Sequence, residues 1–397
     1  MKENINTDNS TQRILWVIPG TGIYRVPVYS YLNQYSKGKF HLICLREDTS
    51  DLVRKKLKNQ LKENLTILTG EKRLTIGNDK TTFANSNFVL KWQPGLYRAI
   101  KRQNPDIVIV EGFGSWAPMA VLYSFLHRKK LCIFYERTAY IERKTPWILT
   151  MYRKFIGRFA NAYLVNGILT EEYLHKYIGV KQKPITKGCM CADSYELAKD
   201  VASFGDEEKR QLSAHLALND GLTYLFVGQL VERKGISQLL QAWQKHIQQH
   251  PADNLLIIGK GYLYDEIMAN YGQTPGVHIL GGISYADIYK YYAISDIFFM
   301  PTLEDNWCLV LPEAMACGKP VACSIYNGGT CELIHDGENG YSFDPYQQQS
   351  ILDALDHFHT ANLVAMGEKS VEIESHFTPD KAARRIYDTC MDICKNK

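Results

Sequence analysis

The sequence predicts an α/β protein with two doubly wound parallel sheets, and three observations lead to this fold class. Short apolar runs alternate with helical stretches, which is typical of βαβ units. Several runs are nearly continuous and β-branched, as at 107–110, so helices are expected to cover both faces of these strands. The scheme occurs twice, and a chain of 397 residues is long enough for two domains with separate cores.

The expected strands fall into two sets. The first set comprises 13–18, 40–45, 106–110, 131–135 and 162–166, and the second comprises 222–227, 254–258, 277–280, 296–300 and 320–323. The polar segment 187–220 shows no strand signal and is interpreted as the linker. We therefore expect one domain at residues 1–190 and a second at residues 191–375.

A last helix is expected after Thr378 and Pro379, which suit an N-cap and a first helical turn. The apolar positions that follow recur at helical spacing and are Ala382, Ala383, Ile386, Tyr387, Cys390 and Ile393. This spacing predicts an amphipathic helix at the end of the chain.

The two halves of the chain differ in charge. Residues 1–190 contain 31 Lys and Arg against 14 Asp and Glu, and residues 191–397 contain 15 against 28, so balances of +17 and −13 give the net charge of +4. Opposite signs indicate domains with different partners. The basic half could face anionic lipid, a phosphorylated acceptor or nucleic acid, or be a solvated face without a partner. Because no motif that reads single strands or grooves occurs, nucleic acid is not expected as a partner.

Composition is that of an ordinary globular protein, with 45% apolar and 22% charged residues. The longest mostly apolar run, 112–126, is interrupted by Pro118 and is too short to span a bilayer. The first twelve residues do not resemble an export signal, and the ten cysteines include no Cys-x-x-Cys pair, so reduced thiols are expected. These observations favour a cytoplasmic location.

The segment 305–323 carries the most distinctive pattern of the chain. Asp305 and Glu313 stand eight positions apart, and Pro312 and Gly318 suit the first turn and the C-terminal cap of a short helix. The helix is expected to begin near 308–310, with backbone N–H groups pointing out of its positive end. The pattern therefore predicts an anion seat with a carboxylate on either flank.

A second group of residues follows the expected strand 222–227. Gly228 lets the backbone approach a ligand closely, and Arg233 and Lys234 stand at the start of a helix expected at 236–246, where cations can reach phosphate oxygens. Gly259 and Lys260 follow the strand 254–258, but the third glycine of a dinucleotide fingerprint does not follow them.

Together these segments resemble the nucleotide-binding signature of group 1 glycosyltransferases, in which two glutamates stand eight positions apart across a helix start. The resemblance covers most of the chain and is strongest over 222–345. It implies the GT-B fold of this retaining family, with two Rossmann-like domains facing each other across a cleft and residues 376–397 packing back on the N-terminal domain. It also implies that the first domain binds the acceptor and the second the nucleotide sugar.

The resemblance assigns roles to individual residues. Lys234 and Arg233 would hold the diphosphate of the donor, and Glu313 would accept hydrogen bonds from the ribose hydroxyls. The other residues expected around the donor are Gly22, Gly228, Gly259, Lys260, Gly282, Cys308, Leu309 and Val310. The last three would donate backbone N–H groups to phosphate.

Two departures from the family pattern concern the reacting centre. Asp305 stands where the family usually has glutamate, and a loop shifted by one residue would bring Glu304 there instead. No histidine follows the strand 131–135, where many relatives place one; Glu136 or Arg137 would contact acceptor or sugar there, or form a structural ion pair. The expected catalytic residues are Asp305, Lys234, Arg233 and Glu136.

No Asp-x-Asp occurs in the chain, and glycosyltransferases of the GT-A architecture commonly hold a divalent metal on that motif. We therefore expect Arg233, Lys234 and the helix start to replace a metal ion at the diphosphate, and we expect no cofactor.

The segment 143–163 interleaves basic residues with Trp147, Tyr152, Phe155 and Phe159. As a helix it could lie in the interface of an anionic membrane, or its aromatic residues could form the inner face of a core helix.

The expected function is that of a retaining glycosyltransferase. It would move a sugar from a nucleoside diphosphate sugar to a glycan or lipid-linked acceptor, in surface polysaccharide, lipopolysaccharide or glycolipid synthesis, as a cytoplasmic and peripheral membrane protein. One alternative is a sugar-nucleotide epimerase or hydrolase on the same fold, which would consume donor without an acceptor. The other is a catalytically silent subunit that binds a nucleotide sugar without transferring it.

Overall fold

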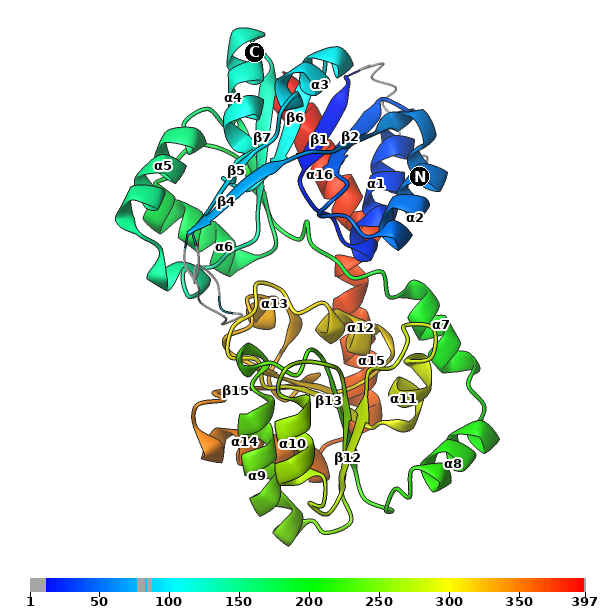
Figure 1. Ribbon diagram of the computed structural model, residues 1–397. Coiled ribbons are helices and arrows are strands. Elements are labelled where there is room, and N and C mark those ends of the chain that lie inside the picture. Colours follow the sequence, from blue (N-terminus) through cyan, green and yellow to red (C-terminus); the bar gives the residue numbers. More distant parts are fainter. Residues whose placement is uncertain (1–11, 77–82, 84–87, 396–397) are drawn as a thin grey trace, which may run out of the picture.

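The computed structural model describes residues 12–76, 83 and 88–395, and it confirms the predicted fold class. Two parallel sheets covered by helices lie one above the other in Figure 1, and the last helix extends from the lower half into the upper one. The amino-terminal half of the chain forms the upper sheet, and the carboxyl-terminal half forms the lower one.

The first sheet has the strand order β3-β2-β1-β6-β7-β8-β9 and pairs its strands in parallel throughout. Its strands are β1 (Ile14–Ile18), β2 (Phe40–Leu45), β3 (Leu65–Leu68), β6 (Ile107–Glu111), β7 (Lys130–Tyr135), β8 (Ala162–Val165) and β9 (Ile185–Thr186). The strand order reverses between β1 and β6, so the carboxyl ends of these strands form a topological switch point, where open α/β sheets bind ligands.

The second sheet has the order β12-β11-β10-β13-β14-β15 and is also parallel. Its strands are β10 (Thr223–Val227), β11 (Asn254–Ile258), β12 (Val277–Gly281), β13 (Ile297–Met300), β14 (Val321–Ser324) and β15 (Gly340–Phe343). Its switch point lies between β10 and β13, which brings the loops that follow Val227 and Met300 side by side.

Most of the helices cover the sheets through an apolar face that the sheet buries. Those of the first half are α1 (Val26–Tyr35), α2 (Asp51–Leu61), α3 (Leu96–Gln103), α4 (Ala117–Leu126), α5 (Trp147–Gly157) and α6 (Ile168–Tyr173). Those of the second half are α7 (Tyr195–Ser203), α8 (Asp206–His215), α9 (Ile236–Gln249), α10 (Tyr264–Tyr271), α11 (Tyr289–Ile294), α12 (Val310–Ala316), α13 (Thr330–Leu333), α14 (Gln348–Asp356) and α15 (Leu363–Glu374).

The last helix, α16 (Pro379–Lys395), returns to the first half of the molecule as expected (Figure 1). Its buried face contains the apolar positions predicted from helical spacing, among them Ala382, Ile386 and Cys390. Thr389 Oγ1 lies 2.7 Å from Thr186 Oγ1 of β9, and the Tyr387 ring lies 6.0 Å from that of Tyr35 in α1. The boundaries expected for the two domains, at residues 1–190 and 191–375, stay predictions.

The structure differs from the sequence-based expectations at the sheet edges and in the segment between the sheets. The strands β3, β9 and β15 were not expected, since they are edge strands that are short or only half-buried. Two further strands, β4 (Lys72–Ile76) and β5 (Phe88–Trp92), form a separate antiparallel pair. The segment interpreted as a linker contains α7 and α8, and these helices bury few side chains, which explains why their sequence is polar.

Within the described residues, none of the helices combines the length and the apolarity that a passage through a lipid bilayer requires.

Candidate active site

Glycines bring three loops together at the switch point of the second sheet. The N–H of Gly228 donates to Ile258 O at 3.0 Å, and a Cβ on Gly259 would clash with the carbonyl oxygen of Gly228. Gly235, the N-cap of α9, has a φ of +69°, and a Cβ there would clash with the carbonyl oxygen of Pro301. The loops after β10, β11 and β13 can therefore approach one another closely at this edge.

Lys234 and Asp305 form an ion pair at this edge. Lys234 ends the 3-10 turn Glu232–Lys234, which directly precedes α9, and Asp305 lies in the loop between β13 and α12. Arg233 adds a second cation, with Nη1 at 3.6 Å from Asp305 Oδ2. The structure thus brings together three residues that the sequence predicted in two segments 71 positions apart.

Both partners of this pair are held in their charged forms. Burial by itself would lower the pKa of Lys234, but the neighbouring acidic groups of Cys308 and Asp305 outweigh it and raise that pKa. Burial would likewise raise the pKa of Asp305, yet Lys234 and Arg233 hold it below its usual value. A buried ion pair of this kind is costly to break unless another charge replaces one partner. An incoming anion could take that place beside Lys234.

Glu304, the alternative acid, pairs through its side chain with a different cation. Its Oε2 accepts a hydrogen bond from Arg143 Nη1 of the first half of the chain at 2.6 Å, and its side chain is only 5% exposed. Glu304 therefore joins the two halves, whereas Asp305 belongs to the cluster with Lys234.

The helix α12 begins at Val310, within the expected range, and Gly318 has a φ of +70° just beyond its end. The expectation for Cys308 needs correction, because its N–H donates to Asn327 Oδ1 at 2.9 Å and is not available to a phosphate. Leu309 and Val310, as N-cap and first residue, have N–H groups without an acceptor inside the helix. The anion seat therefore consists of two amides instead of three.

Glu313 lies in the first turn of α12 and is partly buried. Its Oε1 accepts a hydrogen bond from the hydroxyl of Tyr285 at 3.3 Å. Burial raises the pKa of Glu313 to about 7, so the charge of this carboxyl changes around neutral pH. Tyr285 was missed by sequence reasoning, although it stands in the same loop after β12 as Gly282, which was expected beside the donor.

Lys260 and Gly282 lie together at the rim of this edge. A Cβ on Gly282 would collide with the Lys260 side chain, and both residues are exposed. The two residues expected beside the donor are therefore neighbours in space, on the loops after β11 and β12.

The first sheet also ends in a charged cluster. Arg25, the last residue of the 3-10 turn that Gly22 caps, is buried and contacts Glu111 Oε2 at 2.8 Å and Glu136 Oε2 at 3.5 Å. Glu111 is the last residue of β6, and Glu136 directly follows β7. Burial raises the pKa of Glu111 even though Arg25 opposes this shift. Sequence reasoning missed the roles of Arg25 and Glu111, although an acid at the carboxyl end of an apolar strand was a usable signal.

Glu136 and Arg137 have different partners. Glu136 Oε1 accepts from Asn306 Nδ2 at 3.4 Å, and Asn306 is the neighbour of Asp305, so the charged clusters of the two sheets face each other. Arg137 instead forms an ion pair with Glu142 at 3.2 Å. Burial opposes ionisation of Glu142, but Arg137 and Arg153 lower its pKa to about 2. This is the structural ion pair that the sequence left open.

The basic and aromatic segment folds as α5, but its aromatic residues do not all face inward. Trp147 is 74% exposed and Phe155 is 55% exposed, whereas Tyr152 and Phe159 pack partly against the core. The interpretation as the inner face of a core helix is therefore wrong for Trp147 and Phe155. Phe125 of the neighbouring α4 is 66% exposed and extends the same apolar surface.

Comparison with known proteins gives one family match. The model described as Glycosyl transferases group 1 matches residues 208–370, which include the whole cluster around Lys234 and Asp305.

The curated relatives include proteins named as glycosyltransferases and a spore coat protein. The lipopolysaccharide 1,2-N-acetylglucosaminetransferase of Salmonella typhimurium is 24% identical over 326 residues, covering 79% of this chain and 71% of that protein. Spore coat protein SA of Bacillus subtilis is 30% identical over 155 residues, covering 36% of this chain and 40% of that protein. The match thus spans well under half the length of spore coat protein SA and of an uncharacterized glycosyltransferase of Methanocaldococcus jannaschii, at 40% and 39%.

Solved structures share the whole fold. HepE of Anabaena in complex with UDP has a TM-score of 0.74 at 15% identity and covers 96% of this chain and 100% of its own. A glycosyltransferase of Rickettsia africae has a TM-score of 0.72 at 17% identity and covers 97% of this chain and 99% of its own. At these identities the likeness shows the two-domain GT-B fold over nearly the full length.

Proposed function

Since residues 208–370 belong to the group 1 glycosyltransferase family, we propose that this chain is a retaining glycosyltransferase that uses a nucleoside diphosphate sugar. One observation carries the proposal. At the carboxyl edge of the second sheet, Lys234 and Arg233 pair with Asp305, and Asp305 lies in the loop that leads into the start of α12. Two cations and a helix start are what a diphosphate requires.

Donor binding would rearrange the ion pair. The diphosphate would replace Asp305 as the partner of Lys234 and Arg233, and the amides of Leu309 and Val310 would donate to its oxygens. Asp305 would then be free to accept hydrogen bonds from hydroxyls of the donor sugar. Glu313 would accept from the ribose hydroxyls, with Tyr285 orienting its carboxylate.

The transfer step needs charge stabilisation at the leaving group. The bond between the anomeric carbon and the phosphate oxygen breaks while the acceptor oxygen bonds to the same face of that carbon. The acceptor proton passes to the departing diphosphate, whose growing charge Lys234 and Arg233 stabilise. These cations take the part that a metal ion has in other glycosyltransferases, so we propose a reaction that needs no metal at the diphosphate.

The acceptor would enter from the first domain. A cavity of about 360 Å³ lies beside Ile23 and is lined by α1, α2 and Asp193. Its polar lining residues include Ser30, Gln34 and Lys56, which can exchange hydrogen bonds with sugar hydroxyls. Glu136 and Glu111 would face the reacting centre from this side.

An anionic membrane surface is proposed as the setting, with a glycan or lipid-linked acceptor. Relatives named as a lipopolysaccharide N-acetylglucosaminetransferase and an alpha-monoglucosyldiacylglycerol synthase support this choice. The exposed apolar residues of α4 and α5 support it as well, because exposed basic residues stand in or just after the same helices. The apolar residues are Leu122, Phe125, Leu126, Trp147, Ile148, Met151 and Phe155. The basic residues are Arg128, Lys154 and Arg158.

The proposed function can be tested by thermal shift and by donor turnover. In buffer with EDTA, a nucleoside diphosphate among UDP, GDP and ADP should raise the melting temperature, and the matching nucleotide sugar should release its diphosphate only when an acceptor extract is added. Release at the same rate without acceptor would identify a hydrolase. A shift without turnover in any acceptor extract would identify a binding subunit, and no shift with any nucleotide would refute donor binding.

A further inference from the structure

A cluster of histidines and aspartates lies at the amino end of the second sheet, far from the loops that form the proposed donor site. His246 and His250 come from the end of α9, Asp253 directly precedes β11, and Asp356 ends α14. The donor loops follow the carboxyl ends of the same strands, so the cluster has no part in the proposed transfer reaction.

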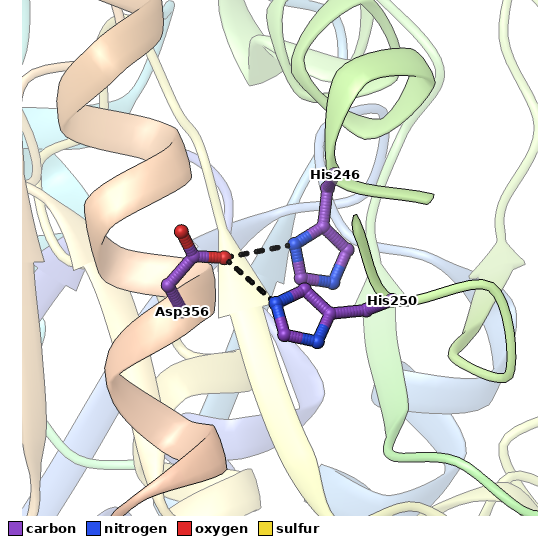
Figure 2. Close-up of side chains that lie close together, drawn as sticks. All are labelled: His246, His250 and Asp356. Atoms are coloured by element: carbon purple, nitrogen blue, oxygen red, sulfur yellow. Dashed lines mark hydrogen bonds and ion pairs between the residues drawn. The ribbon is translucent and has the colours of Figure 1, made fainter. Parts of the chain in front are cut away.

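Three of these side chains converge on one point (Figure 2). Asp356 Oδ1 lies 3.2 Å from His246 Nδ1 and 3.5 Å from His250 Nε2. One ligand atom of each residue lies within 4.8 Å of the other two. In a tetrahedral zinc site with bonds of about 2.0–2.1 Å, neighbouring ligand atoms are about 3.3 Å apart. The distances to Asp356 therefore match the edges of such a site.

The opposite side of His246 is held by a second carboxylate. Its Nε2 lies 2.8 Å from Asp253 Oδ2, which also lies 2.9 Å from His359 Nε2. These distances are shorter than the edge of a zinc site and are those of hydrogen bonds. Asp253 is itself fixed, because its Oδ1 accepts from the N–H of Leu222 at 2.9 Å. A carboxylate that holds the second ring nitrogen of a histidine is the usual support of a metal ligand.

This arrangement determines which nitrogen of His246 is available. When Nε2–H donates to Asp253, the neutral ring has a lone pair on Nδ1, and that lone pair faces a carboxylate oxygen of Asp356. A cation between these two atoms, which are 3.2 Å apart, would be bound by both of them. His246 is fully buried beside Trp243 and Tyr224, so its ring is held in place for a ligand at Nδ1.

We propose that His246 Nδ1, His250 Nε2 and Asp356 Oδ1 bind a divalent transition metal, with zinc as the best match to two imidazoles and one carboxylate. His359 stacks on His250, with ring centroids 3.7 Å apart and an angle of 15° between the planes, and so orients its ring. The side chains of His250 and Asp356 are 28% and 42% exposed, so a water can reach the site as a fourth ligand. The metal braces the end of α9 against the end of α14.

The site is tested on the full chain after treatment with a chelator. Zinc should bind to one site per chain in competition with a chromophoric chelator, and His250→Ala and Asp356→Asn should each weaken its affinity at least about tenfold. Both side chains are partly exposed, so these variants should fold. The matched controls are His215→Ala, an exposed histidine of α8, and Asp353→Asn, an exposed aspartate of α14, and both should bind zinc like the unaltered chain.

Two further readouts separate this site from binding to cysteines. Zinc should raise the melting temperature of the unaltered chain and of both controls, but not of His250→Ala or Asp356→Asn. Cobalt at the site should give the visible bands of a four-coordinate ion without the near-ultraviolet bands of thiolate ligands. Equal zinc affinity in the unaltered chain and in His250→Ala or Asp356→Asn, or cobalt bands typical of thiolates, would overturn the proposal.

Discussion

The two sheets end in charged clusters that face each other but differ in the balance of charge. At the first sheet one cation, Arg25, is shared by two carboxylates, Glu111 and Glu136. At the second sheet two cations, Arg233 and Lys234, share one carboxylate, Asp305. An excess of cations favours a diphosphate, whereas an excess of carboxylates favours hydroxyl groups and proton exchange. The same edge of two similar sheets is thus suited to two different substrates.

The largest effect is expected from removing the buried cation of the second cluster. Lys234→Ala should weaken binding of the nucleotide sugar and lower transfer about 100-fold or more, because it removes a charge that stabilises the leaving group. Isothermal titration and transfer kinetics measure the two effects. The control is Lys290→Ala, which removes a partly exposed lysine that pairs with Asp287. Donor affinity like that of the unaltered chain would contradict the diphosphate assignment.

The acid of the second cluster should act on turnover more than on binding. Asp305→Ala should lower kcat about 10–100-fold while donor affinity changes less, because the carboxylate is expected to contact the sugar during transfer. Glu304→Ala should have a mild effect on both, since its partner is Arg143. The reverse ranking of these two variants would mean that Glu304 takes the role.

The acid-rich cluster of the first sheet should affect the chemical step alone. Glu136→Gln should lower kcat about tenfold and leave the affinity for the donor unchanged, since the side-chain contacts of Glu136 are with Arg25 and Asn306 and the diphosphate is expected at Lys234 and Arg233. Glu196→Gln, an exposed glutamate of α7, is the control in the same assay. Weakened donor binding in Glu136→Gln would place this residue at the diphosphate instead and erase the contrast between the clusters.

Donor affinity should depend on pH through Glu313. Its pKa is raised to about 7, so the carboxylate that accepts the ribose hydroxyls is present above pH 7 and is lost as the pH falls below it. Binding of the nucleotide sugar should weaken up to about tenfold between pH 8 and pH 6. Titrations of Glu313→Gln across the same range should show weak and nearly constant affinity. A pH dependence of equal size in that variant would assign the effect to another group.

The smallest effect is expected at the surface of α4 and α5. Trp147→Ser and Phe155→Ser should each reduce binding to vesicles that contain anionic lipid several-fold, and added salt should weaken the binding of the unaltered chain. Sedimentation with vesicles measures both effects, and Tyr195→Ser, an exposed aromatic of α7, is the control. Sedimentation that does not respond to lipid charge would remove the membrane from this account.

The buried strands were predictable from the sequence because each is a continuous apolar run with a polar or Pro/Gly boundary. β2 and β11 have the predicted bounds, and the other eight differ by one residue at one or both ends. The edge strands were not predictable, because β3 and β15 are half-exposed and lack such a run.

The residues of the candidate site were predictable one segment at a time, but their contacts were not. The pair of Lys234 with Asp305 depends on β10 lying next to β13, which no local pattern encodes. The occupation of the Cys308 amide by Asn327 depends in the same way on the path of the loop after β14. Glu111 is a different case. It was missed, although its position at the end of an apolar strand was visible in the sequence.

The most direct measurement is a crystal structure of the chain with the nucleoside diphosphate that stabilises it, grown without divalent metal. The phosphates should lie against Lys234 Nζ and the amides of Leu309 and Val310, with Asp305 released from Lys234. Phosphates bound at the first sheet, or with Lys234 still paired to Asp305, would contradict the contrast between the two clusters.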